Sequence, residues 1–125
     1  MLAQRNPQAA YNRVAFDARI SGAKPEELVA MCYEQLVSAL GSALIAADRG
    51  DNRMKSTGLT RAVSALTALQ LGVSGEEGVA DALRQFYAAA RRAVLDSVLN
   101  FDARVLASVR QDFIDISRAT AGGTA

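Results

Sequence analysis

Hydrophobic residues recur every three or four positions along most of the chain, which is the spacing of one face of an α-helix. The pattern is clearest between Pro25 and Arg49, where every fourth residue is apolar: Leu28, Cys32, Leu36, Leu40 and Leu44. Strand-like alternation of apolar and polar residues is absent from the sequence. The pattern therefore predicts an all-α protein.

The first half of the chain contains three predicted helices. The first is short, from about Ala9 to Arg19, and a helix of this length must dock on the rest of the chain or fray. The second opens at Pro25, because proline suits the first helical turn, and ends at Gly50, the natural left-handed cap. The third covers roughly Asn52 to Leu71.

Two further helices follow. Ser74 and Glu77 have the spacing of a capping box, which predicts the start of the fourth helix there. Its apolar stripe is Val79, Leu83, Phe86, Ala90 and Val94. Asp102 is placed to cap the last helix, whose stripe is Val105, Leu106, Val109, Phe113 and Ile116.

Long amphipathic helices with short connections favour an antiparallel four-helix bundle in which each helix lies beside its sequence neighbour. The short first segment is then an additional helix or a lid. At 125 residues the chain is one domain that can bury a core without disulfides or metal. We expect the core to span about residues 9–119, with residues 1–8 and 120–125 mobile.

The composition narrows the choice of partners. Half of the residues are hydrophobic and 22% are charged, which is typical of a globular protein, and the net charge is only +1. Partners such as nucleic acid or an anionic membrane surface normally require a basic surplus. The longest apolar stretch, Val37–Ala47, is shorter than the roughly 20 residues that span a bilayer. We therefore expect a cytoplasmic protein that neither binds nucleic acid nor inserts into a membrane.

Catalytic chemistry has little support in this sequence. Histidine is missing, which removes the commonest general base and the commonest metal ligand. The carboxylate pair Glu26 and Glu27 is adjacent, so the two side chains diverge by about 100° on a helix. Cys32 lies on the apolar stripe, where a structural thiol is expected. The sequence predicts a protein without enzymatic activity, catalytic residues, cofactor or metal.

Some apolar residues exceed what a bundle core requires. They lie off the main stripes in three helices: Met31, Leu44 and Ile45, then Met54 and Leu71, then Leu95 and Leu99. Lateral burial between two neighbouring helices accounts for them in one interpretation. An exposed groove for a partner helix accounts for them in the other. The pattern alone favours neither interpretation.

A series of short motifs resembles the flagellar export chaperone family, FliS. Ala10-Tyr11 is followed, fourteen positions after the tyrosine, by Pro25-x-x-Leu28-Val29-x-Met31-Cys32-Tyr33-Glu34. Further matches follow in order: Gly50-Asp51, Arg61-Ala62, Val79-Ala80-x-x-Leu83, Phe86-Tyr87, Arg92 and Asp102. The resemblance covers about residues 10–118.

The chain also departs from the family pattern. Lys24 stands where the family usually has serine, which loses a capping side chain worth about 1 kcal/mol. Cys32 replaces leucine, and Ser97-Val98 replaces Ala-Asn after the fourth helix's arginine. The turn before the fourth helix lacks the family's Leu-Asp and Gly-Gly-Glu. These changes bear on the partner surface and leave the fold unaffected.

The resemblance implies a cytoplasmic chaperone that binds the disordered C-terminal segment of flagellin. Such chaperones prevent premature polymerisation and assist export, which brings components of the flagellar export apparatus into the set of expected partners. The surplus apolar positions are then the predicted groove residues, with Tyr11 and Val14 on a lid over them. The full set is Tyr11, Val14, Met31, Leu44, Ile45, Met54 and Leu71.

Two other functions remain open from the sequence. A self-associating structural or adaptor bundle would pair the same apolar surface with a second copy. Light scattering would show a tight dimer in that case, whereas we expect a monomer or weak dimer of a chaperone. A helical protein associated with nucleic acid would show salt-dependent retention on DNA. If the N-terminal segment is a lid, Tyr11→Ala is expected to strengthen partner binding.

Overall fold

The structure, a computed structural model, describes Gly22 and residues 24–75 and 77–123, with side chains to Thr120. This part of the chain forms four helices and contains no strand: α2 (Pro25–Arg49), α3 (Asn52–Gly72), α4 (Val79–Leu99) and α5 (Ala103–Gly123). The all-α prediction is confirmed. The predicted helix at residues 9–19 lies outside the described residues, as do Tyr11 and Val14.

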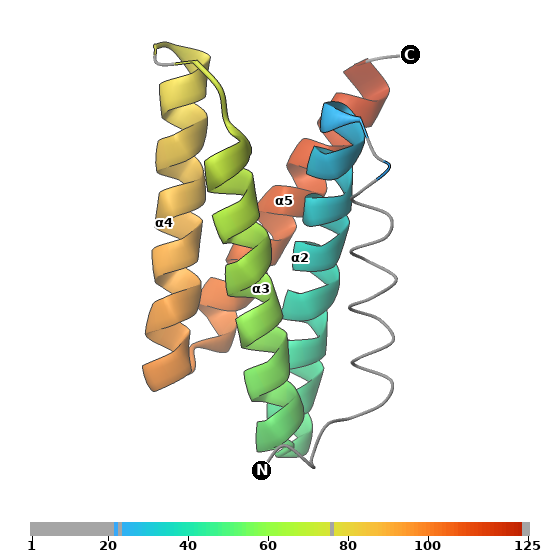
Figure 1. Ribbon diagram of the computed structural model, residues 1–125. Coiled ribbons are helices and arrows are strands. Elements are labelled where there is room, and N and C mark those ends of the chain that lie inside the picture. Colours follow the sequence, from blue (N-terminus) through green and yellow to red (C-terminus); the bar gives the residue numbers. More distant parts are fainter. Residues whose placement is uncertain (1–21, 23, 76, 124–125) are drawn as a thin grey trace.

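The four helices form a bundle in which α3 lies between α2 and α4 (Figure 1). The packing is most extensive between α2 and α3, followed by α3 with α4 and α2 with α5. Helix α5 crosses obliquely behind α2 and α3, so it packs more against α2 than against α4, its neighbour in sequence. The bundle prediction is confirmed, whereas the expectation that each helix lies beside its sequence neighbour is only weakly met for α4 and α5.

The ends of α2 follow from single residues. Lys24 has no capping oxygen in its side chain, but Glu27 reaches back and its Oε1 accepts a hydrogen bond of 2.8 Å from the Lys24 backbone N–H. Half of a capping box is thus retained. At the other end Gly50 has φ 72° and ψ 20°, the left-handed conformation predicted for it.

The starts of the next helices test the capping predictions. Asp51 caps α3 by accepting a 3.0 Å bond from the Met54 N–H. Asp102 caps α5 as predicted, since its Oδ1 accepts from the backbone N–H groups of Arg104 and Val105. The prediction that a capping box at Ser74 starts the fourth helix is wrong. Helix α4 begins at Val79, and its N-cap is Gly78, which has φ 61°.

Small residues bring α2 and α3 close together. The seam between them consists of Gly58 of α3 with Ala39 and Ala43 of α2, and all three residues are buried. A Cβ added at Gly58 would lie 2.8 Å from the Ala39 carbonyl oxygen and 3.1 Å from the Ala43 Cβ. Only glycine therefore permits this separation of the two helices.

Large aromatic rings join the other helices. Phe113 of α5 is fully buried and lies 5.1 Å, centroid to centroid, from both Tyr33 of α2 and Phe86 of α4. The hydroxyl oxygens of Tyr33 and Tyr87 are 2.9 Å apart and share a buried hydrogen bond. Burial and this bond raise the pKa of Tyr33. The sequence stripe for α4 missed Tyr87 and included Val79, which is exposed because it lies in the first turn.

Helix α2 also has the length and composition of a membrane-spanning helix, with a mean hydropathy of 1.5 over its most apolar 18 residues. The expectation that no apolar stretch is long enough to span a bilayer is therefore wrong by length and by mean hydropathy, because alanine, glycine and serine extend the apolar segment of α2. Of these 18 residues, 39% are buried inside the bundle, and the core helix of a soluble protein can have the same length and hydropathy. The length of α2 is accordingly weak evidence for a membrane location.

The end of α5 falls later than the predicted tail. The helix continues to Gly123, whereas the tail was expected to begin at Thr120. The mobility expected for residues 120–125 stays a prediction.

Candidate partner-binding surface

The described residues hold no group of three or more acidic, cysteine or histidine side chains that could bind a metal ion. Cys32 is buried in the core, and its burial raises the pKa of its thiol. A thiol in that environment is less often ionised and so less reactive.

Two of the predicted groove residues lie against the bundle. Met31 is only 8% exposed, although it lies outside the main cluster of core side chains. Leu44 is partly buried and packs against that cluster. A partner can reach Met31 only after the chain rearranges around it, whereas part of Leu44 is accessible directly.

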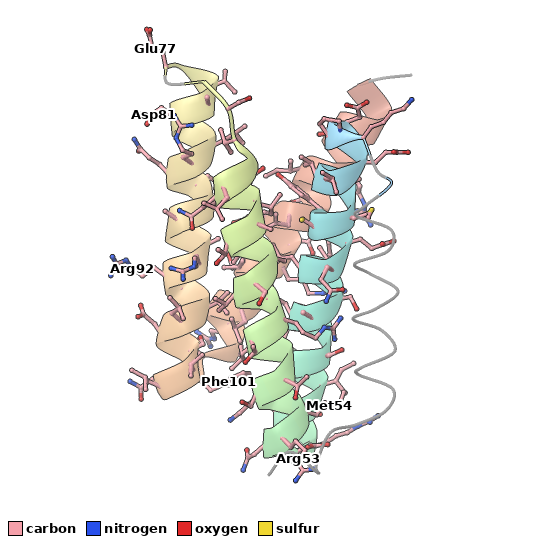
Figure 2. The ribbon with its side chains drawn as sticks, viewed as in Figure 1. Arg53, Met54, Glu77, Asp81, Arg92 and Phe101 are labelled. Carbon is pink, nitrogen blue, oxygen red and sulfur yellow. The ribbon has the colours of Figure 1, made fainter. Side chains whose placement is uncertain are left out.

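The other predicted residues lie at opposite ends of the bundle. Ile45, half exposed, belongs to the last turns of α2, and Met54, partly buried, to the first turn of α3. Figure 2 shows Met54 beside Arg53 at the end where α2 turns into α3. Leu71 is 81% exposed at the far end of α3. Leu71 follows Met54 by seventeen positions, which correspond to about 25 Å of helix.

The predicted groove residues therefore do not form one compact site. Leu44, Ile45 and Met54 lie near the α2–α3 turn, while Met31 and Leu71 lie near the other end of the same two helices. A partner that contacts both groups must extend along the bundle. A long, chain-like partner fits this arrangement better than a compact one.

Other exposed apolar side chains were not among the predicted groove residues. Leu95, Val98 and Leu99 lie in the last two turns of α4, with Leu99 86% exposed, and Val105 follows in α5. Leu95 and Leu99 were recognisable as surplus apolar positions, but sequence alone gave no reason to place them with Val105. The weak packing of α4 on α5 is what leaves them exposed.

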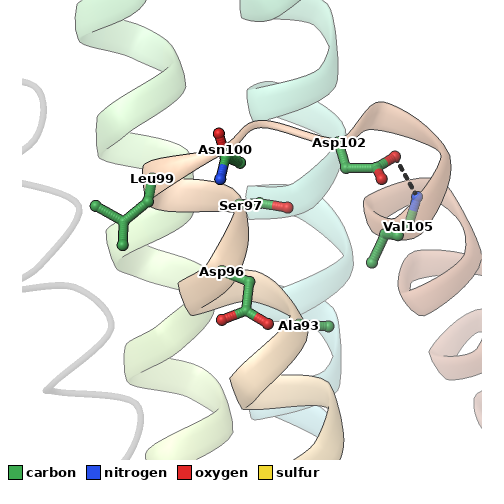
Figure 3. A pocket seen from close by; sticks show the side chains of 7 residues that line it. All are labelled: Ala93, Asp96, Ser97, Leu99, Asn100, Asp102 and Val105. Atoms are coloured by element: carbon green, nitrogen blue, oxygen red, sulfur yellow. Dashed lines mark hydrogen bonds between the residues drawn. The ribbon is translucent and has the colours of Figure 1, made fainter.

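A cavity of about 460 Å³ opens between the end of α4 and the start of α5 (Figure 3). Its lining is Ala93, Asp96, Ser97, Leu99, Asn100, Asp102 and Val105. Ser97 is 1% exposed, and its Oγ has no hydrogen-bond partner. An unsatisfied buried hydroxyl costs about 1–3 kcal/mol, so it is uncommon in a folded protein.

Not all arginines of α4 form the solvated face expected from the sequence. Arg91 Nε donates a 2.9 Å hydrogen bond to Thr67 Oγ1 of α3, and Arg84 donates to the Val73 carbonyl oxygen at 3.5 Å. Only Arg92 is fully on the outside, as Figure 2 shows. Arg84 and Arg91 therefore tie α4 to α3, which leaves no basic patch for a polyanion on this helix.

Of the aromatic residues that carry the resemblance to FliS, those that the structure describes lie at the centre of the bundle. Tyr33 and Tyr87 are buried, and Phe86 packs against the core. Their rings meet at Phe113. These motif residues therefore contribute to the core of the fold.

Comparison with known proteins agrees with this assignment. The family described as flagellar protein FliS matches residues 7–119, which is most of the chain. The flagellar secretion chaperone FliS of Salmonella typhimurium is 27% identical over 113 residues, covering 88% of this chain and 84% of that protein. On the match along nearly its whole length, together with its all-helical bundle, the chain belongs to the FliS family.

Proposed function

We propose that this protein is a flagellar secretion chaperone that binds the disordered C-terminal segment of flagellin in the cytoplasm. By covering that segment it prevents premature polymerisation and delivers flagellin to the export apparatus. Membership of the FliS family supports the chaperone role. The proposal includes no enzymatic activity and no cofactor.

The observation that carries the proposal is the distribution of exposed apolar side chains. Ile45 and Leu71 are 50% and 81% exposed at the two ends of the α2–α3 pair. A disordered segment can wrap such separated contacts, because it orders only on binding and follows the surface of its partner. The ordering consumes several kcal/mol of the interaction energy, which favours moderate affinity and later release.

Calorimetric titration with a flagellin C-terminal fragment tests the proposal. We expect saturable binding with a negative heat-capacity change, since apolar surface becomes buried. Leu71→Ser is expected to weaken binding about tenfold, equivalent to about 1.4 kcal/mol. Ala68→Ser changes an exposed residue of the same helix and serves as the matched control.

Two outcomes would contradict this function. One is the absence of saturable binding throughout the micromolar range. The other is equal binding by Leu71→Ser, Ile45→Ser and the control, which would remove the α2–α3 pair from the interface. A tight dimer in light scattering, lost in Leu71→Ser, would instead support the self-associating bundle.

A further inference from the structure

The cavity between α4 and α5 combines negative charge with apolar walls. Asp96 and Asp102 contribute carboxylates, and Asn100 contributes an amide, while Ala93, Leu99 and Val105 are apolar. No basic residue lines the cavity. A volume of about 460 Å³ lies within the range of about 300–1,000 Å³ typical of ligand pockets.

The two carboxylates retain free acceptor capacity. Asp102 uses Oδ1 to cap α5, which leaves its second oxygen without a partner in the described structure. Asp96 forms neither a hydrogen bond nor an ion pair through its side chain with any residue the structure describes. The carboxyl end of α4 adds partial negative charge, and Asp102, as the cap of α5, offsets the partial positive charge at the start of that helix. The site therefore favours a cation.

Ser97 provides an independent indication of a ligand. It is almost completely buried, its Oγ lacks a partner, and it lines the cavity. In Figure 3 its side chain extends from α4 toward the side of the cavity formed by Asp102 and Val105. A serine oxygen has two lone pairs and its O–H rotates about the Cβ–Oγ bond, so this hydroxyl can accept a hydrogen bond from a group that enters the cavity.

We propose that this cavity is an anchor site for an arginine side chain of a bound polypeptide. The guanidinium group has five N–H donors in a planar fork, which suits acceptors at Asp96, Asp102 and Ser97. Leu99 and Val105 pack against the aliphatic stem. A bare metal ion fits less well, because the apolar walls offer it no ligands. The partner is a polypeptide with an arginine beside apolar residues, which contact the exposed Leu95 and Val98.

This site is distinct from the predicted groove residues that the structure describes, since none of these lines the cavity. It does not rest on the proposed function, because the inference needs only a polypeptide of this chemistry. The anchor site and flagellin binding can therefore succeed or fail separately, and the calorimetric titration above distinguishes them.

Nuclear magnetic resonance titration of the full chain with N-acetylarginine methylamide tests the site directly. We expect saturable shifts at the backbone amides of Ser97, Leu99 and Asn100, with a dissociation constant in the millimolar range. The neutral isostere N-acetylcitrulline methylamide should cause no saturable shift there. The lysine analogue lacks the planar fork, so its affinity should be lower than that of the arginine analogue by a factor of at least about three.

Variants complete the test. Asp96→Asn is expected to weaken arginine binding about fivefold, since a charge-assisted hydrogen bond becomes a neutral one. Asp112→Asn removes the same charge from an exposed position on α5 and should leave binding unchanged. Ser97→Ala is expected to weaken binding about twofold while the fold stays intact.

Several results would overturn the anchor site. Equal binding of the citrulline analogue would show that charge is irrelevant, and equal binding of the lysine analogue would exclude recognition of the guanidinium fork. Equal losses in Asp96→Asn and Asp112→Asn would indicate a general charge effect. Absence of saturation up to the solubility limit would also contradict the proposal.

Discussion

The two halves of the bundle are held together in different ways. Between α2 and α3 the packing is the most extensive in the bundle, and at the seam Gly58 approaches Ala39 and Ala43 closely. Between α4 and α5 the contact is limited, and a cavity opens at their junction. The α2–α3 pair therefore forms a continuous support, while α4 and α5 leave apolar surface uncovered.

The comparison shows how one small bundle can combine a stable core with surface for a partner. Small side chains allow extensive helix contact at little cost in side-chain entropy. Large rings, in contrast, hold α4 and α5 at the level of Phe113 and leave their junction open. Changes in the seam or at Phe113 should affect stability, whereas changes at the open junction should affect binding.

The largest expected effect is at Phe113, which joins both halves. Phe113→Ala removes a fully buried ring and leaves a cavity, so we expect a loss of about 3–5 kcal/mol in the free energy of unfolding. Urea denaturation followed by circular dichroism measures it. Phe101→Ala, in the α4–α5 turn beneath Lys55, is the control and should cost about 1 kcal/mol. Equal losses would show that Phe113 is not the joint between the halves.

The next effect distinguishes Gly41 of α2 from Gly58 of α3. Gly58→Ala forces a Cβ to 2.8 Å from the Ala39 backbone, so overpacking should lower stability by about 1–3 kcal/mol. Gly41→Ala meets only the Arg110 side chain, whose Nε lies 3.2 Å from the added Cβ and donates a 3.0 Å hydrogen bond to the Val37 carbonyl oxygen. The small shift required of that side chain offsets part of the helix propensity of about 1 kcal/mol, so stability should change little. Chemical denaturation should show a clear loss for Gly58→Ala only, and equal stability of the two variants would refute the close seam.

A smaller effect concerns the hydroxyl pair at the centre of the bundle. Tyr33→Phe and Tyr87→Phe each leave one buried hydroxyl without its partner, which should cost about 1–3 kcal/mol. The double variant should lose less than the sum of the single losses, because it removes both polar groups. A double-variant cycle in urea measures the coupling, and strict additivity would argue against the bond.

The same pair predicts a pH dependence. The pKa of Tyr33 is raised in the folded state, so its contribution to stability is complete below the unfolded pKa of about 10. As the pH rises past that value the unfolded state loses protons first, and stability declines. Denaturation between neutral pH and pH values above 10 should show the decline. Tyr33→Phe should reduce it, and an unchanged slope would contradict the assignment.

The smallest expected effect on stability is at the open junction. Leu99→Ala removes an 86% exposed side chain, so the free energy of unfolding should change by less than about 0.5 kcal/mol. Leu66→Ala, at a fully buried position of α3, is the matched control and should cost about 2–5 kcal/mol. Similar losses would mean that the end of α4 is part of the core.

The periodic sequence determined the identity and approximate limits of the described helices. Pro25 and Gly50 fixed both ends of α2, and Asp102 fixed the start of α5, because each acts through local backbone geometry. The same local reasoning failed at Ser74. Val73, the residue before Ser74, packs on the core, and α4 begins only at Val79, five residues after the serine.

The tertiary structure alone decided which surplus apolar residues are exposed. Periodicity gave Met31 and Leu71 the same status, yet one is buried and the other is open to solvent. Periodicity also did not predict that Ser97 of α4 and Asp102, the cap of α5, line the same cavity. Burial depends on which neighbour covers a face, and that is a long-range property that the spacing within one helix does not contain.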